Sequence, residues 1–517
     1  MKYTPDGVNL IFSKMNNSTG SLIFFEKGKR KEKSYTEVLF DVKKSVAFFK
    51  DKGIKKGDRI GLSSKNCYNW LLVDLASLYM GCVIVPFDVN YRNSSQWFLD
   101  YYELKVLFLD ILDYDHIQEK TINLSEEFNW DLYKPIETKP HYYEPKEIIA
   151  FKFTSGTTSS PKAIETQRYS VDDCIVNIQK MFTHTTSDKL LLFMPLYLLQ
   201  QRFFIYSSIL FEYELVLISF EHVFYALVKE QPTVVLGVPH LWETFHKNCL
   251  DKLTQDEKLN KAFQLFKAEK TKEKFLPFLN DLGGNIRYCW TGSAPISDVT
   301  LDFFETLNIP IYQGYGMSET GIISKNYPEY NKTGSVGKLL DNREIRIDES
   351  GEILIKNLFP INTKYYKQET SCKVYLKDGF VATGDIGFVD DDGYLFITGR
   401  KKDMIVFSNG KKIWPNKIEK FLETQTAMIK NCIVYGEKQT HLVALLMIRE
   451  EKNKNDIHKK VLSLNKQLNP DERIINYQII NNELSIENGF LSAQGKIKRD
   501  AVYKHYYNEF MNLYKII

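Results

Sequence analysis

Apolar positions in residues 1–145 alternate between two patterns. Arg59–Leu62 and the run from Gly81 to Pro86 are short apolar segments typical of buried strands. The amphipathic run Val38–Phe49 and the apolar run Trp70–Met80 have the length and spacing of helices, and Thr36 is predicted to cap the first. This alternation predicts layered α/β structure around a largely parallel sheet.

The same rhythm recurs at residues 190–195, 233–238 and 309–312, and it changes after Asp341. Short alternating segments separated by Glu-Ser-Gly and Asp-Asp-Gly turns predict a small β-rich subdomain over residues 341–400. A chain of 517 residues is too long for one hydrophobic core. We therefore expect an N-terminal domain over residues 1–400 and a separate, mobile α+β domain over residues 401–517.

The overall composition excludes several classes of protein. The 68 basic and 65 acidic residues leave a net charge of +3, so no global field favours nucleic acid. The seven cysteines are scattered without a C-x-x-C pair, which indicates a reducing compartment rather than a disulfide framework or a zinc site. The N-terminus lacks a secretory pattern, and charged residues interrupt the most apolar stretch, residues 190–220. The expectation is a soluble cytoplasmic protein without a transmembrane segment.

The hydroxyl-rich segment Thr154–Lys162 is the first candidate for chemistry. It follows the predicted strand Ile149–Phe153 and combines six hydroxyl side chains, one glycine and one lysine. Such a loop can surround phosphate oxygens with hydrogen-bond donors while the lysine offsets their charge. It lacks the spacing of a Walker loop, and a Ser/Thr-rich surface turn is the alternative.

This segment resembles the T-S-G-T-T-G-x-P-K-G signature of the adenylate-forming enzymes, which include acyl-CoA synthetases, peptide-synthetase adenylation domains and luciferases. Ser159 and Ala163 replace glycines of that signature. The resemblance implies an ATP site with phosphate contacts from the segment, and the residues assigned to it are Thr154, Ser155, Gly156, Thr157, Thr158 and Lys162.

The segment Ile311–Thr320 is similar to the Y-G-x-T-E motif of the same family. By this likeness Tyr315 stacks on adenine and Glu319 binds the Mg²⁺ that accompanies ATP. Thr291–Pro295 looks like the turn whose backbone borders the adenine. The remaining nucleotide-binding residues implied by these two motifs are Ser293, Ala294, Pro295, Gly314, Gly316 and Ser318.

Two further motifs, one containing Asp385 and one containing Arg400, resemble motifs of the family and follow in the same order along the chain. Asp385 is predicted to accept the ribose hydroxyls, and Arg400 to complete the ribose and phosphate contacts. A hairpin through the Asp390–Gly393 turn could bring these two residues together. The resemblance also implies a hinge near Lys402 and a catalytic lysine at Lys496, with Lys162 and Glu319 assisting in catalysis.

The acyl site is predicted from likeness to long-chain acyl-CoA synthetases, carried by residues 194–202, 232–243 and 487–491. The residues assigned to its pocket are Tyr197, Leu198, Phe203 and Val238. Simple core packing is the alternative for each of them. Leu198 stands where that group has a histidine, and the stretch offers no aspartate suited to an α-ammonium group.

These motifs together predict an acid–thiol ligase that uses ATP, Mg²⁺ and CoA. It would convert a carboxylic acid, expected to be a fatty acid, into an acyl-adenylate and then into an acyl-CoA. Transfer to the phosphopantetheine of a carrier protein is one alternative. A degenerate adenylate-binding protein without activity is the other, suggested by Ser159, Ala163 and Leu198.

Overall fold

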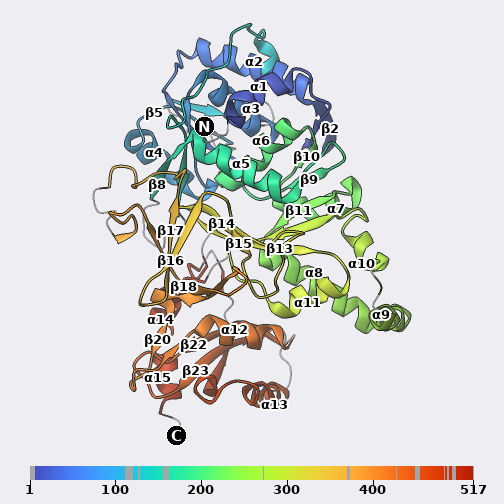
Figure 1. Cartoon of the computed structure of the whole chain (residues 1–517), viewed down its shortest axis with the longest axis vertical. Helices are drawn as coiled ribbons and strands as arrows, with labels where there is room; N and C mark the ends of the chain where they lie inside the picture. The colour runs from blue at the N-terminus through green and yellow to red at the C-terminus, as the bar shows by residue number, and fades with distance from the viewer. Residues whose placement is uncertain are drawn as a thin grey trace.

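The computed structural model places a large N-terminal body above a small C-terminal domain (Figure 1). It describes residues 6–110, 120–125, 128–154, 162–269, 271, 273–368, 373–426, 428–448, 454–481, 484–485, 488–491 and 497–515. This architecture of a large α/β domain and a separate small domain confirms the predicted fold class.

A nine-stranded sheet forms the centre of the N-terminal body. Its order is β15-β14-β13-β12-β11-β9-β10-β1-β2, and the strands from β13 to β1 are all parallel. An antiparallel hairpin closes each edge. The strands are β1 (Ser21–Glu26), β2 (Lys29–Ser34), β9 (Lys189–Leu192), β10 (Glu214–Leu217), β11 (Val234–Gly237), β12 (Tyr288–Thr291), β13 (Ile311–Met317), β14 (Gly321–Lys325) and β15 (Lys338–Leu339).

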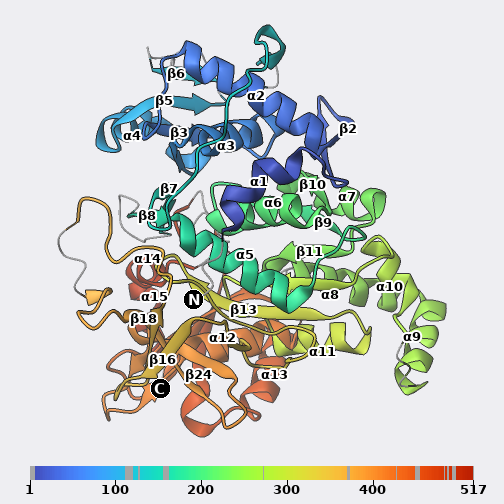
Figure 2. The same ribbon diagram turned by 45° about the horizontal axis from the view of Figure 1, so that its top comes forward.

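A second sheet of six strands has the order β6-β5-β3-β4-β7-β8, parallel except for the β7–β8 hairpin. Its strands are β3 (Arg59–Ser63), β4 (Val83–Pro86), β5 (Leu104–Leu109), β6 (Thr121–Asn123), β7 (Ile148–Phe153) and β8 (Ala163–Gln167). Five helices lie between the two sheets (Figure 2), and their apolar faces join strand residues of both in one core. They are α1 (Gly7–Met15), α2 (Tyr35–Asp51), α3 (Tyr68–Met80), α5 (Arg168–Phe182) and α6 (Leu199–Phe211).

The outer faces of the two sheets are covered by separate helices. Helix α4 (Ser95–Tyr101) packs on the six-stranded sheet. A second core lies beneath the helices on the outer face of the nine-stranded sheet. These helices are α7 (Val223–Glu230), α8 (Pro239–Gln255), α9 (Glu257–Glu269), α10 (Leu276–Asp281) and α11 (Asp298–Thr306).

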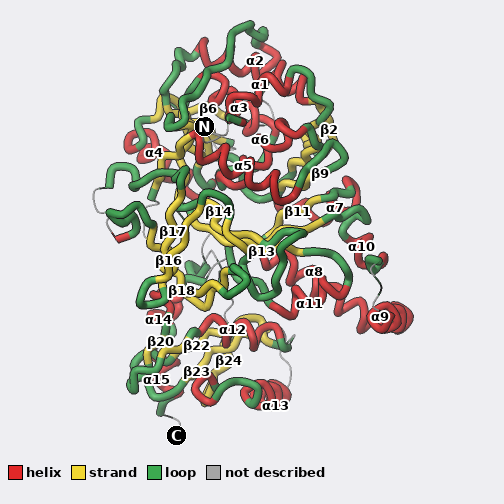
Figure 3. The backbone as a smooth tube through the Cα atoms, viewed as in Figure 1, coloured by secondary structure: helices red, strands yellow, loops and turns green. Residues whose placement is uncertain are grey.

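An antiparallel sheet of four strands connects the N-terminal body to the C-terminal domain (Figure 3). Its strands are β16 (Arg343–Ile347), β17 (Glu352–Asn357), β18 (Val381–Val389) and β19 (Leu395–Arg400). The predicted alternating segments after Asp341 correspond to β16, β17 and β19.

The C-terminal domain has core clusters made only of its own residues, as expected of an independent domain. Its sheets are the pair β20 (Ile405–Val406) and β21 (Lys412–Ile413) and the triplet β22 (Ile429–Tyr435), β23 (Leu442–Ile448) and β24 (Ile474–Ile480). Its helices are α12 (Pro415–Thr424), α13 (Lys454–Asn465), α14 (Arg499–His505) and α15 (Tyr507–Leu513).

Most predicted elements agree with the structure, but the predicted cap of α2 is wrong. The helix begins at Tyr35, and Ser34 is its N-cap. The Ser34 hydroxyl accepts from the Glu37 backbone N–H at 3.3 Å, and the Glu37 carboxylate accepts from the Ser34 N–H at 2.8 Å. This reciprocal capping box satisfies two backbone donors, so the helix starts before Thr36. The Thr36 hydroxyl instead donates to the Met15 carbonyl at 2.8 Å.

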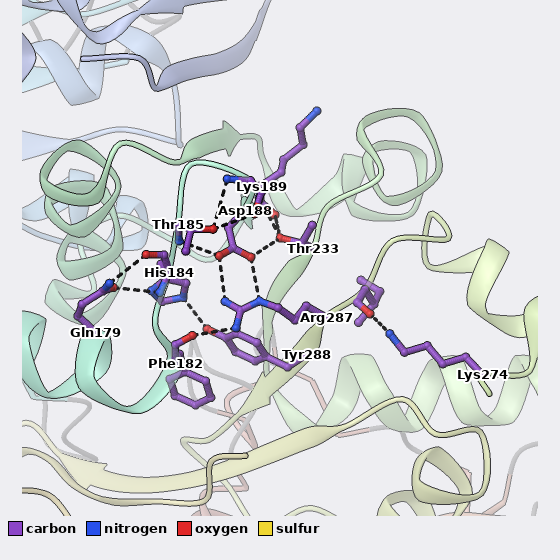
Figure 4. A network of polar contacts seen from close by, with 12 residues as sticks. Gln179, Phe182, His184, Thr185, Asp188, Lys189, Thr233, Lys274, Arg287 and Tyr288 are labelled. Atoms are coloured by element: carbon purple, nitrogen blue, oxygen red, sulfur yellow. Dashed lines mark hydrogen bonds and ion pairs between the residues drawn. The ribbon is translucent and has the colours of Figure 1, made fainter. Parts of the chain in front are cut away.

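A polar network at the amino ends of β9, β11 and β12 joins these strands (Figure 4). The Arg287 guanidinium donates to both oxygens of Asp188 at 2.9 and 3.0 Å, and the Thr233 hydroxyl donates to one of them at 2.9 Å. Beside it, His184 Nε2 lies 2.7 Å from the Tyr288 hydroxyl. Burial of this imidazole lowers the pKa of His184 to about 4. The network thus anchors the edge of the sheet opposite the carboxyl ends of its strands.

No helix in the described part of the chain has both the length and the apolar character needed to cross a membrane.

Candidate active site

The β13–β14 hairpin carries five of the predicted site residues, among them Tyr315 and Glu319. Its turn lies against the end of β7, where the Ser318 hydroxyl donates to the Phe153 carbonyl at 3.4 Å. The register shifts between Tyr315 and Gly316. A Cβ at Gly316 would lie 2.3 Å from the Gly321 carbonyl oxygen, so the hairpin can close this tightly only with glycine there. The turn thus places Tyr315 and Glu319 on one short segment.

Asp385 lies at the Tyr315 end of this site. Its carboxylate accepts from the Tyr315 hydroxyl at 2.6 Å and from Arg400 Nε at 2.9 Å. Asp385 and Arg400 are register partners of β18 and β19, as the predicted hairpin requires. Burial, reinforced by the Asp385 charge, raises the pKa of Tyr315. For Arg400, burial lowers the pKa, but the attraction of Asp385 outweighs it and the net shift is upward. Both donors therefore stay protonated beside a carboxylate.

Glu319 lies at the other end, next to the β7–β8 hairpin. It is buried, and its carboxylate accepts from the Tyr365 hydroxyl at 2.5 Å. The ammonium of Lys162 lies 4.9 Å from the centre of the Tyr365 ring, a cation–π distance. Burial lowers the pKa of Lys152, although the nearby Glu319 charge opposes this. A carboxylate, a phenol and two amines are thus gathered in one place.

The predicted phosphate segment is the connection between β7 and β8. The Thr154 backbone N–H donates to the Lys162 carbonyl at 2.9 Å and closes its base. Ser155, Gly156, Thr157 and Thr158 lie outside the described residues, so their role as phosphate ligands stays a prediction.

The predicted adenine turn lies beside Gly314. Strand β12 ends at Thr291 and runs parallel to β13, so residues 292–295 leave the sheet next to it. A Cβ at Gly292 would lie 3.2 Å from the Gly314 carbonyl oxygen. Ser293 has a positive φ of 71°, which turns the chain away from the sheet. Ser293 and Pro295 are exposed and Ala294 is half-buried, so all three could border a planar ligand.

The four predicted acyl-pocket residues have diverse environments. The Tyr197 hydroxyl donates to the Asp88 carboxylate at 2.7 Å. Leu198 and Val238 are the residues before α6 and α8, and both are half-buried. Phe203 is buried in the core between the two sheets. Their roles in acid binding stay predictions, and core packing accounts for Phe203.

Two site residues are predicted in the C-terminal part of the chain, Lys402 and Lys496. Lys402 is exposed in the 3₁₀ helix η6 (Lys401–Asp403), between β19 and β20. This is the chain connection between the four-stranded sheet and the C-terminal domain. Lys496 lies outside the described residues.

Sequence reasoning missed Tyr365 and Lys325. Tyr365 is in the long connection after β17, where no periodic pattern or motif marks it. Lys325 is fully buried at the end of β14, with Nζ 2.5 Å from the Tyr312 carbonyl oxygen and 3.6 Å from the centre of the Trp290 ring. Burial lowers its pKa well below the usual value. A Cβ at Gly314 would lie 2.6 Å from Lys325 Cδ, so this side chain fills the space beneath Gly314.

Several solved structures share this fold. One is the o-succinylbenzoate CoA synthetase MenE of Bacillus subtilis with its acyl-adenylate intermediate (TM-score 0.76, 18% identity, covering 96% of this chain and 98% of that one). Another is ATP-bound MatB of Rhodopseudomonas palustris (TM-score 0.80, 18% identity, covering 98% and 100%).

Sequence comparison gives the family directly. The AMP-binding enzyme family model matches residues 12–358, and the AMP-binding enzyme C-terminal domain model matches residues 402–516. The chain belongs to the AMP-binding enzyme family. This confirms the predicted resemblance and the prediction that the protein is an enzyme.

The individual relatives have low sequence identity to this chain. The long-chain-fatty-acid–CoA ligase FadD15 of Mycobacterium bovis is 24% identical and covers 89% of each chain. The 2-succinylbenzoate–CoA ligase of Listeria monocytogenes is 25% identical to this chain, and the match covers 91% of this chain and 94% of the ligase.

Proposed function

We propose that this enzyme activates a fatty acid with ATP to give an acyl-adenylate and pyrophosphate, and then transfers the acyl group to the thiol of CoA. Two relatives matched over about nine tenths of their length are named CoA ligases, one of them for long-chain fatty acids. A further long-chain-fatty-acid–CoA ligase matches 73% of this chain. This supports the predicted acid–thiol ligase and disfavours a degenerate binding protein.

The convergence of Tyr315, Asp385 and Arg400 is the observation that carries this proposal. Each oxygen of a carboxylate has two lone-pair directions, and Asp385 uses one on each oxygen for Tyr315 and Arg400. Two directions are left for a pair of neighbouring hydroxyls, which is the arrangement a ribose presents. The Tyr315 ring and the turn at Ser293 then border the place of the base.

The opposite end of the site suits phosphates and a divalent cation. Lys162 supplies positive charge and Glu319 one carboxylate. No cluster of three or more His, Cys, Asp or Glu side chains suited to a metal occurs among the residues that the structure describes. Mg²⁺ commonly takes one or two carboxylates and completes its shell with water and substrate phosphates, so the Glu319 environment fits it. When bound, this ion neutralises phosphate charge.

The chemistry proposed for the site has two steps. A carboxylate oxygen of the acid attacks the α-phosphorus, the new O–P bond forms, and the bond to pyrophosphate breaks. Both reactants are anions, so a cation between them stabilises the developing charge, and we assign this role to Lys496. The CoA thiolate then attacks the acyl carbonyl carbon and AMP leaves. Rotation of the C-terminal domain about Lys402 would move Lys496 out of the site and admit the thiol of CoA.

The experiment that tests this function is acid-dependent ATP–pyrophosphate exchange over saturated acids of increasing length. Product formation is then measured with CoA and with holo-carrier proteins as acceptors. We expect exchange with fatty acids and acyl-CoA as the product. Lys496→Ala should suppress exchange far more than ATP binding, whereas Lys498→Ala should affect both little. Absence of exchange with every acid would refute the function, and thioester on the carrier protein alone would replace CoA as acceptor.

A further inference from the structure

Helix α7 exposes apolar side chains on the face that points away from the sheet. Phe224, Tyr225 and Val228 are 45%, 56% and 54% exposed, and Phe220 in the preceding turn η4 (Phe220–His222) is 47% exposed. The opposite face of the helix is buried through Val223, Ala226 and Leu227. A surface helix normally presents polar residues to water. We call Phe220, Phe224, Tyr225 and Val228 the α7 apolar face; exposed apolar patches of this kind are typical of interaction sites.

The β1–β2 hairpin beside this face is strongly basic. Residues 27–33 contain five lysines or arginines and one glutamate, and β2 is an edge strand of the nine-stranded sheet. Lys29 and Lys31 are exposed on this strand. Lysines on an edge strand discourage sheet-to-sheet aggregation, which accounts for one or two of them. Protection against aggregation does not account for the α7 apolar face next to these lysines. We call residues 27–33 the basic hairpin.

Direct contacts join the two features into one surface. Arg30 Nε donates to the Glu230 carboxylate at the end of α7 at 2.9 Å. The Phe25 and Tyr225 rings are in edge contact, with centroids 6.4 Å apart. Figures 1 and 2 both show β2 and α7 on the same side of the N-terminal body.

This surface also reaches the edge of the sheet where the predicted acid-binding segment begins. Phe220 follows the carboxyl end of β10, and its ring lies 5.8 Å from that of Phe193. Phe193 directly precedes the segment 194–202. Since β1 runs parallel to β10, the tip of the basic hairpin lies at this same edge.

We propose that the α7 apolar face and the basic hairpin dock this enzyme on an anionic lipid bilayer. Aromatic side chains favour the interface between headgroups and acyl chains, and lysines near it are attracted by anionic lipid. Neither feature alone binds a bilayer firmly, but an apolar face flanked by basic residues combines both contributions. Fatty acids partition into bilayers, so docking would bring the acid site to its substrate; this last point rests on the proposed function.

The test is co-sedimentation of the full chain with phosphatidylcholine vesicles and with vesicles containing phosphatidylglycerol, at low and high salt. We expect binding to the anionic vesicles that weakens with salt. Lys29→Gln/Lys31→Gln should weaken it roughly 30-fold, from the usual contribution of a lysine near an anionic surface. Phe224→Ser/Tyr225→Ser should weaken it at both salt concentrations. The matched controls Lys105→Gln/Lys139→Gln and Leu265→Ser/Leu276→Ser, exposed elsewhere, should bind like the wild type.

Three results would overturn the proposal. The first is an equal loss of vesicle binding in the variants and in the controls. The second is that the wild type does not bind anionic vesicles at low salt. The third is that the same substitutions abolish a dimer or a carrier-protein complex instead of lipid binding. Thermal unfolding verifies that each variant is folded. Exchange with hexanoate, a water-soluble acid, should stay at the wild-type rate in all variants. Lipid binding without exchange with any acid would contradict only the proposed function, and exchange without lipid binding would contradict only the role of this surface.

Discussion

The Tyr315 hydroxyl and the Asp385 carboxylate are joined by a 2.6 Å hydrogen bond across 70 positions of sequence. The bond connects the β13–β14 hairpin of the nine-stranded sheet to the four-stranded sheet. Arg400 holds the other carboxylate oxygen at 2.9 Å. The carboxylate is therefore fixed before any ligand arrives, which would lower the entropy cost of the ribose binding proposed for it.

Asp385→Asn tests this arrangement. The amide keeps the shape but loses the charge, so hydrogen bonds from a ribose and from Arg400 weaken. Hydrogen bonds to charged groups contribute about 1.5–3 kcal/mol each, so we expect KM for ATP to rise roughly 10- to 100-fold. Initial rates of ATP–pyrophosphate exchange measure this. Asp392→Asn, in the exposed turn after β18, is the control and should leave KM unchanged. Equal KM values in both variants would contradict the role of Asp385.

The Glu319–Tyr365 pair leads to a prediction about Mg²⁺. Glu319→Gln should raise the Mg²⁺ concentration for half-maximal exchange by about tenfold or more, because a neutral amide is a poor ligand for this ion. Tyr365→Phe removes only the hydrogen bond that orients the carboxylate, so its shift should be smaller. Titration of exchange with MgCl₂ at fixed ATP provides the measurement. Tyr330→Phe, an exposed ring, is the control. A larger shift for Tyr365→Phe than for Glu319→Gln would reverse the assignment.

Parts of this site could be predicted because they lie in short continuous motifs that resemble those of a known family. Asp385 and Arg400 flank a recognisable turn, and Tyr315 and Glu319 belong to one hairpin motif. Tyr365 could not be predicted, since it approaches Glu319 from a connection without periodicity. For Phe203, an apolar pattern does not distinguish a core position from a pocket position.

The cap of α2 shows a different kind of error. The pattern Ser34-x-x-Glu37 indicates a capping box, whereas Thr36 lies closer to the apolar run and does not cap the helix. The capping signal was therefore more informative than the start of the apolar pattern.

An ion pair between the two domains leads to a prediction about the half-reactions. Lys420 Nζ on α12 lies 2.6 Å from the Glu243 carboxylate on α8. Both side chains are partly exposed, so the pair contributes about 1 kcal/mol or less. Lys420→Glu should disfavour this domain arrangement and change one half-reaction, by no more than about fivefold. Comparing exchange with CoA-dependent thioester formation measures this. Glu243→Lys/Lys420→Glu should restore the wild-type ratio, and failure to do so would refute the pairing.

The burial of His184 predicts that the folded protein loses stability in acid. Its pKa is about 4 in the folded protein because of burial, and about 6.5 in the unfolded chain. Between these values only the unfolded chain binds the proton, so the contribution of His184 is complete above about pH 6.5 and falls as the pH drops towards 4. The loss amounts to about 3 kcal/mol at most. In urea unfolding from pH 7 to 4, His184→Gln should show a shallower decline. His458→Gln, an exposed histidine, is the control, and an equal change of slope in it would contradict this account.

The last prediction concerns Gly337, before β15. It has a φ of 86°, and a Cβ there would lie 1.9 Å from the Lys325 carbonyl carbon and 2.1 Å from the Asn326 nitrogen. These are backbone atoms, so β14 itself would have to move. Gly337→Ala should therefore cost more than about 4 kcal/mol of unfolding free energy.

Gly57 provides a matched control for this change. Its φ is 83°, and a Cβ there would meet nothing within 4 Å. Gly57→Ala pays only for the left-handed backbone, about 1–2 kcal/mol. Thermal unfolding of both variants separates conformational strain from steric clash. Because Lys325 contacts the Tyr312 carbonyl on β13, Gly337→Ala should also raise KM for ATP, whereas Gly57→Ala should not. Equal destabilisation of the two variants would show that the close approach of Gly337 to β14 contributes nothing.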